Sequence, residues 1–183
     1  MALDNKLNIT DSTELARMEE KISKKKAVEL FENGYLDNYE AGTFKMLAAI
    51  HKYLFEDVYP FAGKFREENI SKGEFRFASC EYIEPELDRI LAQLAKENFL
   101  EGLSKIELAK RLAYYLSELN VLHPFREGNG RTNREFIRQL ALKNGYILNL
   151  KNIPPKEVLD ASIKSVVDTS DLEKIIEKML ENK

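Results

Sequence analysis

Residues 123–138 hold the side chains of this sequence that are best suited to chemistry on phosphates. They read His-Pro-Phe-Arg-Glu-Gly-Asn-Gly-Arg-Thr-Asn-Arg-Glu-Phe-Ile-Arg. A helix is expected to start near residue 131, directly after the small residues Gly128, Asn129 and Gly130. Small residues there let backbone N–H groups turn inward and form an anion site at a helix N-terminus. Arg131 and Arg134 are close enough to this loop to bind further phosphate oxygens in a bidentate manner.

Two titratable side chains, His123 and Glu127, stand at the entrance of this loop. Imidazole is the side chain best matched to proton abstraction near neutral pH. A carboxylate beside bound phosphates is a usual ligand of Mg²⁺, which prefers oxygen donors and keeps several waters. The sequence therefore predicts nucleotide phosphates held by backbone and arginines, with a base at His123 and a metal ligand at Glu127. A purely structural loop would not need all of these residues together.

The elements that must position these residues are mostly helical. Apolar residues recur at helical spacing, and the helices expected from this spacing and from capping signals are at 12–22, 24–32, 41–55, 85–94, 104–122, 131–143, 155–167 and 170–180. Ser104 with Glu107, and Ser170 with Glu173, are typical of capping boxes. The fold class that this pattern predicts is all-α, a helical bundle.

One segment departs from the helical pattern, between residues 61 and 81. Ser71-Lys72-Gly73 indicates a turn, and the alternation in Glu74-Phe75-Arg76-Phe77 indicates a short strand. A lone hairpin on a helical body is marginally stable. We therefore expect it to be either packed down or kept mobile for use.

Length and composition limit the class of protein. The 183 residues carry a net charge of −3, which argues against a broadly basic nucleic-acid binder. The sequence shows neither an apolar signal region at its start nor a run near the roughly 20 apolar residues that span a bilayer. Its single cysteine, Cys80, forms no intrachain disulfide and no multi-cysteine metal site, and is expected to be a small core or loop residue. We expect one cytoplasmic domain, residues 1–183, that binds neither nucleic acid nor membrane. His51 is interpreted as a satisfied, partly buried histidine.

The run from His123 to Arg134 matches in full the signature H-x-F-x-[D/E]-G-N-G-R-x-x-R of Fic-domain proteins, and the chain resembles a bacterial Fic protein. The resemblance covers roughly residues 10–145, with a C-terminal helical segment at about 155–181 beyond it. It extends to Ile50-His51-Lys52-Tyr53-Leu54-Phe55, Tyr59-Pro60-Phe61-Ala62-Gly63-Lys64-Phe65-Arg66 and Asn69-Ile70-Ser71-Lys72-Gly73 with Phe75-Arg76-Phe77.

The resemblance implies a Fic fold with a short β-hairpin flap, and transfer of AMP from ATP to a Ser, Thr or Tyr hydroxyl of a target protein with release of pyrophosphate. In that family mechanism His123 would deprotonate the hydroxyl, and Glu127 would hold Mg²⁺ against the α- and β-phosphates. Gly128, Asn129 and Gly130 would cradle the phosphates, and Arg131 and Arg134 would bind the β- and γ-phosphates. The flap (residues 70–77) would clamp the target by backbone pairing; its expected contact residues are Ile70, Ser71, Lys72, Gly73, Phe75, Arg76 and Phe77.

Other functions stay open at this point. They are a Doc-like protein kinase, a transferase of another nucleotide, and a non-catalytic binding module. Doc-like signatures carry lysine after Gly-Asn and lack the full arginine set, so Gly130 and the two arginines favour AMP transfer.

Regulation also stays open. The inhibitory pattern [S/T]-x-x-x-E-[G/N] of many Fic proteins has only near matches here, at Thr10–Glu14, at Thr169–Glu173 and at the C-terminal Glu181-Asn182. A degenerate internal inhibitor, with the C-terminal helix as the preferred candidate, a small antitoxin-like partner, and an inhibitory segment beyond this sequence all remain, as does a homo-oligomer.

Overall fold

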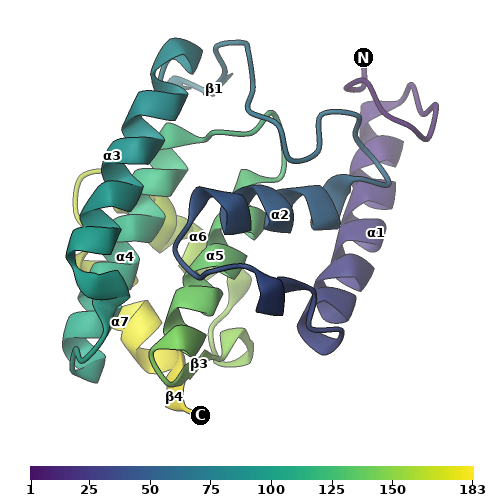
Figure 1. Ribbon diagram of the computed structural model, residues 1–183. Coiled ribbons are helices and arrows are strands. Elements are labelled where there is room, and N and C mark those ends of the chain that lie inside the picture. Colours follow the sequence, from purple (N-terminus) through teal and green to yellow (C-terminus); the bar gives the residue numbers. More distant parts are fainter.

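The computed structural model describes residues 1–183, the side chain of Asn152 excepted, and is mainly helical (Figure 1). The α-helices are α1 (Ser12–Glu32), α2 (Phe44–Phe55), α3 (Ile83–Lys96), α4 (Lys105–Leu122), α5 (Asn129–Lys143), α6 (Pro155–Lys164) and α7 (Ser170–Met179). Short 3₁₀ turns are η1 (Tyr35–Asn38), η2 (Cys80–Tyr82), η3 (Asn98–Leu100) and η4 (Leu150–Asn152). The strands are β1 (Ser71–Lys72), β2 (Phe75–Arg76), β3 (Tyr146–Leu148) and β4 (Leu180–Asn182). The all-α prediction is confirmed.

Helices α4 and α5 form the centre of the molecule. Helix α4 packs against α3, α5 and α7, and α5 packs against α2, which in turn packs against α1 (Figure 1). The sequence connecting α4 to α5 is the phosphate-binding loop predicted above, so the loop is supported by two helices that contribute to the core.

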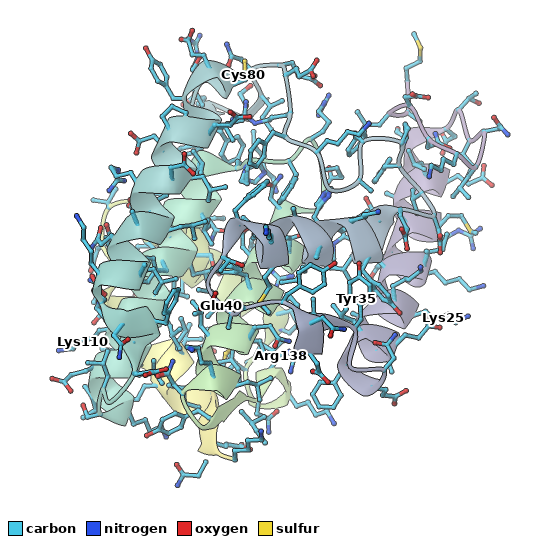
Figure 2. The ribbon with its side chains drawn as sticks, in the orientation of Figure 1. Lys25, Tyr35, Glu40, Cys80, Lys110 and Arg138 are labelled. Carbon is cyan, nitrogen blue, oxygen red and sulfur yellow. The ribbon has the colours of Figure 1, made fainter. Side chains whose placement is uncertain are left out.

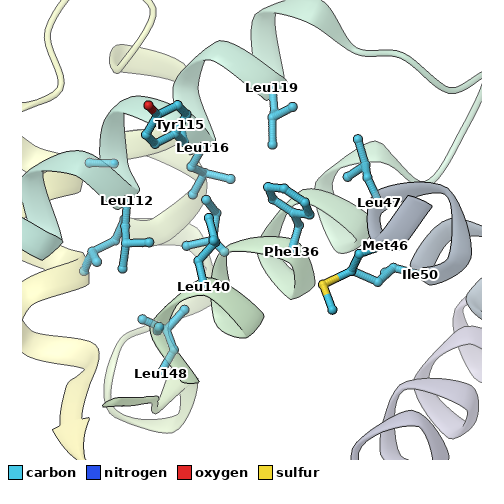
Figure 3. Close-up of a cluster of buried hydrophobic side chains, with 14 of the residues drawn as sticks. Met46, Leu47, Ile50, Leu112, Tyr115, Leu116, Leu119, Phe136, Leu140 and Leu148 are labelled. Carbon is cyan, nitrogen blue, oxygen red and sulfur yellow. The ribbon is translucent and has the colours of Figure 1, made fainter. Parts of the chain in front are cut away.

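Apolar faces of these helices meet in one core. Figure 3 shows Leu47 and Ile50 of α2 opposite Phe136 of α5, with Leu116 and Leu119 of α4 beside them. The cluster of buried apolar side chains is continuous from Leu15 in α1 to Leu180 in β4. This continuity supports our proposal that the 183 residues form a single domain.

Residues 12–32 form one helix, so the prediction of two separate helices there is wrong. The run Lys24-Lys25-Lys26 does not interrupt α1, because lysine is a good helix former and two of the three pair with glutamates one turn away. Lys24 lies 2.5 Å from Glu20, and Lys25 lies 3.5 Å from Glu29. Ser23, at the expected break, is buried.

Several element ends also differ from the sequence prediction. Helix α2 starts at Phe44 because Thr43 accepts a hydrogen bond from the N–H of Met46 (3.3 Å) and caps the helix there. Helix α5 starts at Asn129, two residues earlier than expected. Leu180, expected at a helix end, belongs to β4, which pairs antiparallel with β3 through Leu148. That pairing joins segments distant in sequence, which local patterns do not indicate.

The irregular segment contains the expected hairpin, with a different turn. Ser71 pairs with Arg76 and Lys72 with Phe75, so the turn lies at Gly73 and Glu74 and Ser71-Lys72 is a strand. Cys80, near the top of Figure 2, lies where the chain leaves the hairpin and enters α3. Among the described residues, no helix combines the length and apolar character that crossing a bilayer requires.

Candidate active site

His123 lies directly after the last residue of α4, with a backbone φ of +51°. Its Nδ1 is 3.1 Å from the carbonyl oxygen of Asn120, and because a carbonyl only accepts, Nδ1 carries the proton. The lone pair is then on Nε2. The ring of Phe77 stacks on the imidazole with centroids 3.7 Å apart. Burial lowers the pKa of His123 to about 4, so its imidazole is neutral and able to accept a proton at neutral pH.

The loop between His123 and α5 is held closed by Asn129. The side chain of Asn129 accepts a hydrogen bond from the N–H of Phe125 (2.8 Å) and donates one to the carbonyl oxygen of Phe125 (2.7 Å). Phe125 is fully buried, so it anchors the loop in the core. The amide of Asn129 therefore shapes the loop, and what Asn129 offers to a ligand is its backbone N–H.

Gly128 allows the sharp entry into α5. Its φ is +79°, and a Cβ at this position would lie 2.4 Å from the ring of Phe55. Both the backbone conformation and the contact therefore favour glycine. No side chain caps α5 at Gly128, so the N–H groups of Asn129, Gly130 and Arg131 lack intrahelical acceptors. With the helix dipole behind them, these groups form an anion-binding site.

Arg131 is held by α1. It forms an ion pair with Glu19 and donates a hydrogen bond to the hydroxyl of Ser23 (2.7 Å), and its guanidinium lies over the ring of Phe55. Glu19 is 5% exposed and also accepts a hydrogen bond from the hydroxyl of Tyr59 (2.8 Å). The sequence analysis did not find Glu19, because a glutamate on a predicted amphipathic helix carries no local sign of burial.

Arg134 lies beside the same helix end without a carboxylate partner among the described residues. A Cβ at Gly130 would come 3.3 Å from its guanidinium, so glycine leaves room for this side chain. Burial lowers the pKa of Arg134. Two glutamates of the near matches to the inhibitory pattern have other partners: Glu173 accepts a hydrogen bond from Thr169 (2.6 Å), and Glu181 accepts one from Asn149 (3.0 Å).

The other arginines of the segment have local partners. Arg126 pairs with Glu68, and Arg138 pairs with Glu135 at 2.6 Å. Of the four arginines between residues 126 and 138, Arg134 therefore has no carboxylate partner among the described residues, while Arg131, although paired with Glu19, also faces the space between α1 and α5.

Glu127 is the acidic residue of the loop, and its side chain is 46% exposed. Its Oε1 accepts a hydrogen bond from the N–H of Gly128 (2.8 Å) and lies 3.9 Å from the guanidinium of Arg131. Among the described residues, no three His, Cys, Asp or Glu side chains gather as a metal site. One accessible carboxylate beside a phosphate site nevertheless fits Mg²⁺, which binds through one or two carboxylates together with substrate phosphates.

An open pocket of about 930 Å³ lies between α1 and α5. Glu127, Arg131 and Arg134 line one side of this α1–α5 pocket, and Glu19 and Ser23 line the other. Its volume is within the usual range for a small-molecule site.

His51 supports the loop from α2. Its Nδ1 accepts a hydrogen bond from the N–H of Gly63 (2.8 Å), so its Nε2 carries the proton and donates to the carbonyl oxygen of Glu127 (2.9 Å). Its ring stacks on Phe125 with centroids 3.8 Å apart. Both nitrogens are satisfied, as interpreted from the sequence, although the side chain is fully buried and not partly so.

The flap lies across the C-terminal end of α4. Ser71, Lys72, Phe75 and Arg76 are exposed, so the hairpin offers free backbone edges. Phe77, also expected to contact a target, points its ring at His123 instead of at solvent. Arg66, a buried residue to which the sequence analysis assigned no role, hydrogen-bonds the backbone on both sides of the flap.

The comparisons agree with this geometry. The model of the Fic/DOC family matches residues 42–141, which include α2, the flap and the whole 123–134 signature. The chain belongs to the Fic/DOC family.

The chain is also similar to curated proteins that are named protein adenylyltransferases. The chain is 42% identical over 168 residues to protein adenylyltransferase VbhT of Bartonella schoenbuchensis, which covers 92% of this chain and 34% of that protein. It is 40% identical over 164 residues to the probable protein adenylyltransferase y4lH of Sinorhizobium fredii, which covers 89% of this chain and 82% of that one. The chain therefore spans about a third of the first relative and most of the second.

Solved Fic structures show the same fold. The N-terminal FIC domain of Bep8 from Bartonella sp. 1-1C superposes with a TM-score of 0.90 at 24% identity, over 98% of this chain and 91% of that one. The N-terminal Fic domain of a cell filamentation protein from Bartonella quintana, solved with bound ADP, gives a TM-score of 0.86 at 26% identity, over 100% and 92% of the two chains.

Proposed function

We propose that this chain is a protein adenylyltransferase that transfers AMP from ATP to a Ser, Thr or Tyr hydroxyl of a target protein. The observation that carries the proposal is a single loop that has the neutral imidazole of His123, with its Nε2 unprotonated, at one end and the uncapped N-terminus of α5 at the other. Arg131 and Arg134 lie on the first turns of that helix. The names of relatives about 40% identical to the chain support it.

The residues divide the work of the transfer. Nε2 of His123 takes the proton of the target hydroxyl, whose oxygen attacks the α-phosphorus of ATP. An O–P bond to the target forms, the bond from the α-phosphorus to the oxygen bridging the α- and β-phosphates breaks, and pyrophosphate leaves. The N–H groups at the start of α5 and the guanidinium groups of Arg131 and Arg134 stabilise charge on the phosphates. Burial keeps His123 neutral and ready for this step.

Glu127 is the residue that we propose as the protein ligand of Mg²⁺. Its carboxylate reaches solvent beside the loop, and its Oε2 stays available while Oε1 accepts the N–H of Gly128. The bound ion would offset phosphate charge and orient the leaving group.

Labelled ATP tests the proposed reaction. The purified chain is incubated with cell lysate, Mg²⁺ and either α-labelled or γ-labelled ATP, next to His123→Ala and to Arg89→Ala as a control. Arg89 is a surface residue of α3, paired with Glu86 and Glu118. We expect protein-bound label from α-labelled ATP alone, lost in His123→Ala and kept in Arg89→Ala.

The same assay separates the alternatives. Label from γ-labelled ATP alone would replace the proposal with a Doc-like kinase. No label from either would favour a binding module. Competition by unlabelled CTP, GTP or UTP stronger than that by ATP would replace ATP with another nucleotide.

A separate inhibitor is our proposal for how activity is held off. Arg134 has no carboxylate partner among the described residues, and the α1–α5 pocket beside it is open to a small antitoxin-like protein. We expect the purified chain to be active alone, whether it is a monomer or a homo-oligomer. In the cell we expect it to act in the cytoplasm. Glu14→Gly, Glu173→Gly and Glu181→Gly should keep that activity within twofold. A tenfold rise in any of them would show an internal inhibitor instead.

A further inference from the structure

Arg66 is a buried arginine whose guanidinium binds backbone carbonyl groups and, among the side chains that the structure describes, no carboxylate. Arg66 is 4% exposed. Its Nε donates to the carbonyl oxygen of His123 (2.8 Å), its Nη1 to that of Glu68 (2.7 Å), and its Nη2 to those of Ala78 (2.5 Å) and Leu122 (3.2 Å). Four carbonyl oxygens from three separate segments thus meet on one side chain.

These carbonyl groups connect two parts of the site. Glu68 and Ala78 are on the two sides of the flap, one before it and one after it. Leu122 and His123 form the C-terminal end of α4, where unpaired carbonyls attract a cation. Two backbone hydrogen bonds join the same segments. The N–H of Arg66 donates to the carbonyl oxygen of Pro124 (3.0 Å), and the N–H of Ala78 donates to that of Val121 (3.3 Å). The base of the flap is therefore fixed to the backbone that carries His123.

The flap also contacts the imidazole itself. Phe77 stacks on His123 at an interplanar angle of 18°, and the N–H of Phe77 donates to the carbonyl oxygen of Ile70 across the hairpin (3.3 Å). Closing the hairpin therefore places this ring on His123. The backbone of His123 also needs support. Its φ of +51° is unfavourable for a residue with a Cβ and must be held by the surrounding contacts.

We propose that Arg66 and Phe77 are positioning residues that couple the flap to His123, so that the imidazole keeps its orientation and its Nδ1–H tautomer only while the flap is docked. The proposal rests on the proposed function, in which His123 is the general base. It adds a second role to the flap: besides any contact with a target, the flap sets the state of the base.

The charged groups around His123 are consistent with this role. Arg66, at the base of the flap, and Lys72, in β1, both disfavour a second positive charge on the imidazole, while the carbonyl of Asn120 in α4 favours the Nδ1 proton. Two of these three influences, and the stacked ring of Phe77, come from the flap or its base. Opening the flap should therefore change both the tautomer and the titration of His123.

The two histidines of the chain make this measurable. His51 and His123 are its only histidines, and the structure gives them opposite tautomers, Nε2–H in His51 and Nδ1–H in His123. Imidazole ¹⁵N NMR on histidine-labelled protein distinguishes the two forms, and His123→Gln assigns the signals. His51 then reports in every sample whether the fold is intact.

The variants are Phe77→Ala, Phe77→Tyr, Arg66→Lys and Glu74→Ala, all measured without nucleotide. Phe77→Ala and Arg66→Lys should turn the His123 signal into a mixture of tautomers and move its titration midpoint from about 4 towards the ordinary 6.5, with His51 unchanged. Phe77→Tyr keeps a ring stacked on His123, so its His123 signal should be the same as in the parent protein. Glu74→Ala changes an exposed residue of the flap turn and should leave His123 as it is.

A His123 signal that is the same in Phe77→Ala as in the parent protein would overturn the proposal, because Phe77 is the part of the flap that touches the ring. Should Arg66→Lys unfold, which the His51 signal reports, the Phe77 variants decide alone.

A second readout compares transfer with binding. In Phe77→Ala we expect label transfer from α-labelled ATP to fall at least tenfold, while affinity for ATP stays within twofold because Arg131 and Arg134 are untouched. Equal losses in both would also contradict the proposal. The NMR arm uses no ATP, so a failure of AMP transfer leaves its result separately interpretable.

Discussion

Gly128→Ala should be among the most damaging small substitutions in the chain, and Gly102→Ala provides its control. Gly128 has φ +79°, and a methyl group added there would lie 2.4 Å from the ring of Phe55, whereas Gly102 has φ +80° with nothing within 4 Å of the added group. The left-handed backbone costs an L-residue about 1–2 kcal/mol at either position. Overpacking adds about 1–3 kcal/mol at Gly128 alone.

The two variants should therefore differ by about 1–3 kcal/mol in free energy of unfolding, measured by urea denaturation. For a chain of this size, this corresponds to roughly 2–12 °C in melting temperature. Phe55→Leu in the Gly128→Ala background should recover part of the added loss by giving the methyl group space, a coupling that a double-mutant cycle isolates. Equal losses in Gly128→Ala and Gly102→Ala, within about 0.5 kcal/mol, would refute the steric part of the reasoning.

Three further predictions follow from the charges of the site. Arg134→Met should leave the melting temperature unchanged or higher, since it removes a partly buried cation that has no carboxylate partner among the described residues. Calorimetry should show at least tenfold weaker ATP binding; a clear loss of stability would contradict this. Glu19→Ala should lower the free energy of unfolding in urea by about 1–3 kcal/mol, because Arg131 and the hydroxyl of Tyr59 lose a shared partner, and Glu19→Gln should lose less; a change below about 0.5 kcal/mol in Glu19→Ala would show the pair to be unimportant. Burial lowers the pKa values of His51 and His123 to about 4, so between pH 4 and 6.5 the unfolded chain binds more protons than the folded one. The free energy of unfolding should therefore keep the full contribution of both imidazoles above pH 6.5 and fall towards pH 4 by up to about 3 kcal/mol for each of them. The fall with pH should be smaller in His123→Gln; an equal fall there would contradict the assignment.

The sequence was sufficient for the parts of the fold and site that depend on local patterns. The helical class, most helices and the capping box at Ser104 and Glu107 follow from spacing and capping chemistry, and the structure contains them. The loop before α5 was predictable for a similar reason, because the residues that form an anion site at a helix N-terminus are consecutive. The satisfied state of His51 was also anticipated, although its full burial and its partners Gly63 and Glu127 were not.

The rest depends on contacts between segments distant in sequence. Nothing in the sequence near Glu19 or Arg131 indicates their ion pair, because it forms only when α1 packs beside α5. Arg66 has no pattern of its own, because its partners are backbone carbonyl groups, which every residue has. Strands β3 and β4 are short and pair across more than 30 residues, so neither shows a strand signal that outweighs the neighbouring helices.

The unpaired charge of Arg134 has a consequence for how long the protein survives in a cell. A cation that is desolvated on folding and meets no anion lowers the free energy of unfolding until a phosphate supplies the missing charge. A ligand at about a hundred times its dissociation constant adds about 2.7 kcal/mol to the folded state. We therefore expect resistance to proteolysis to follow the supply of nucleotide, so that the chain is degraded faster in energy-starved cells than in well-fed ones.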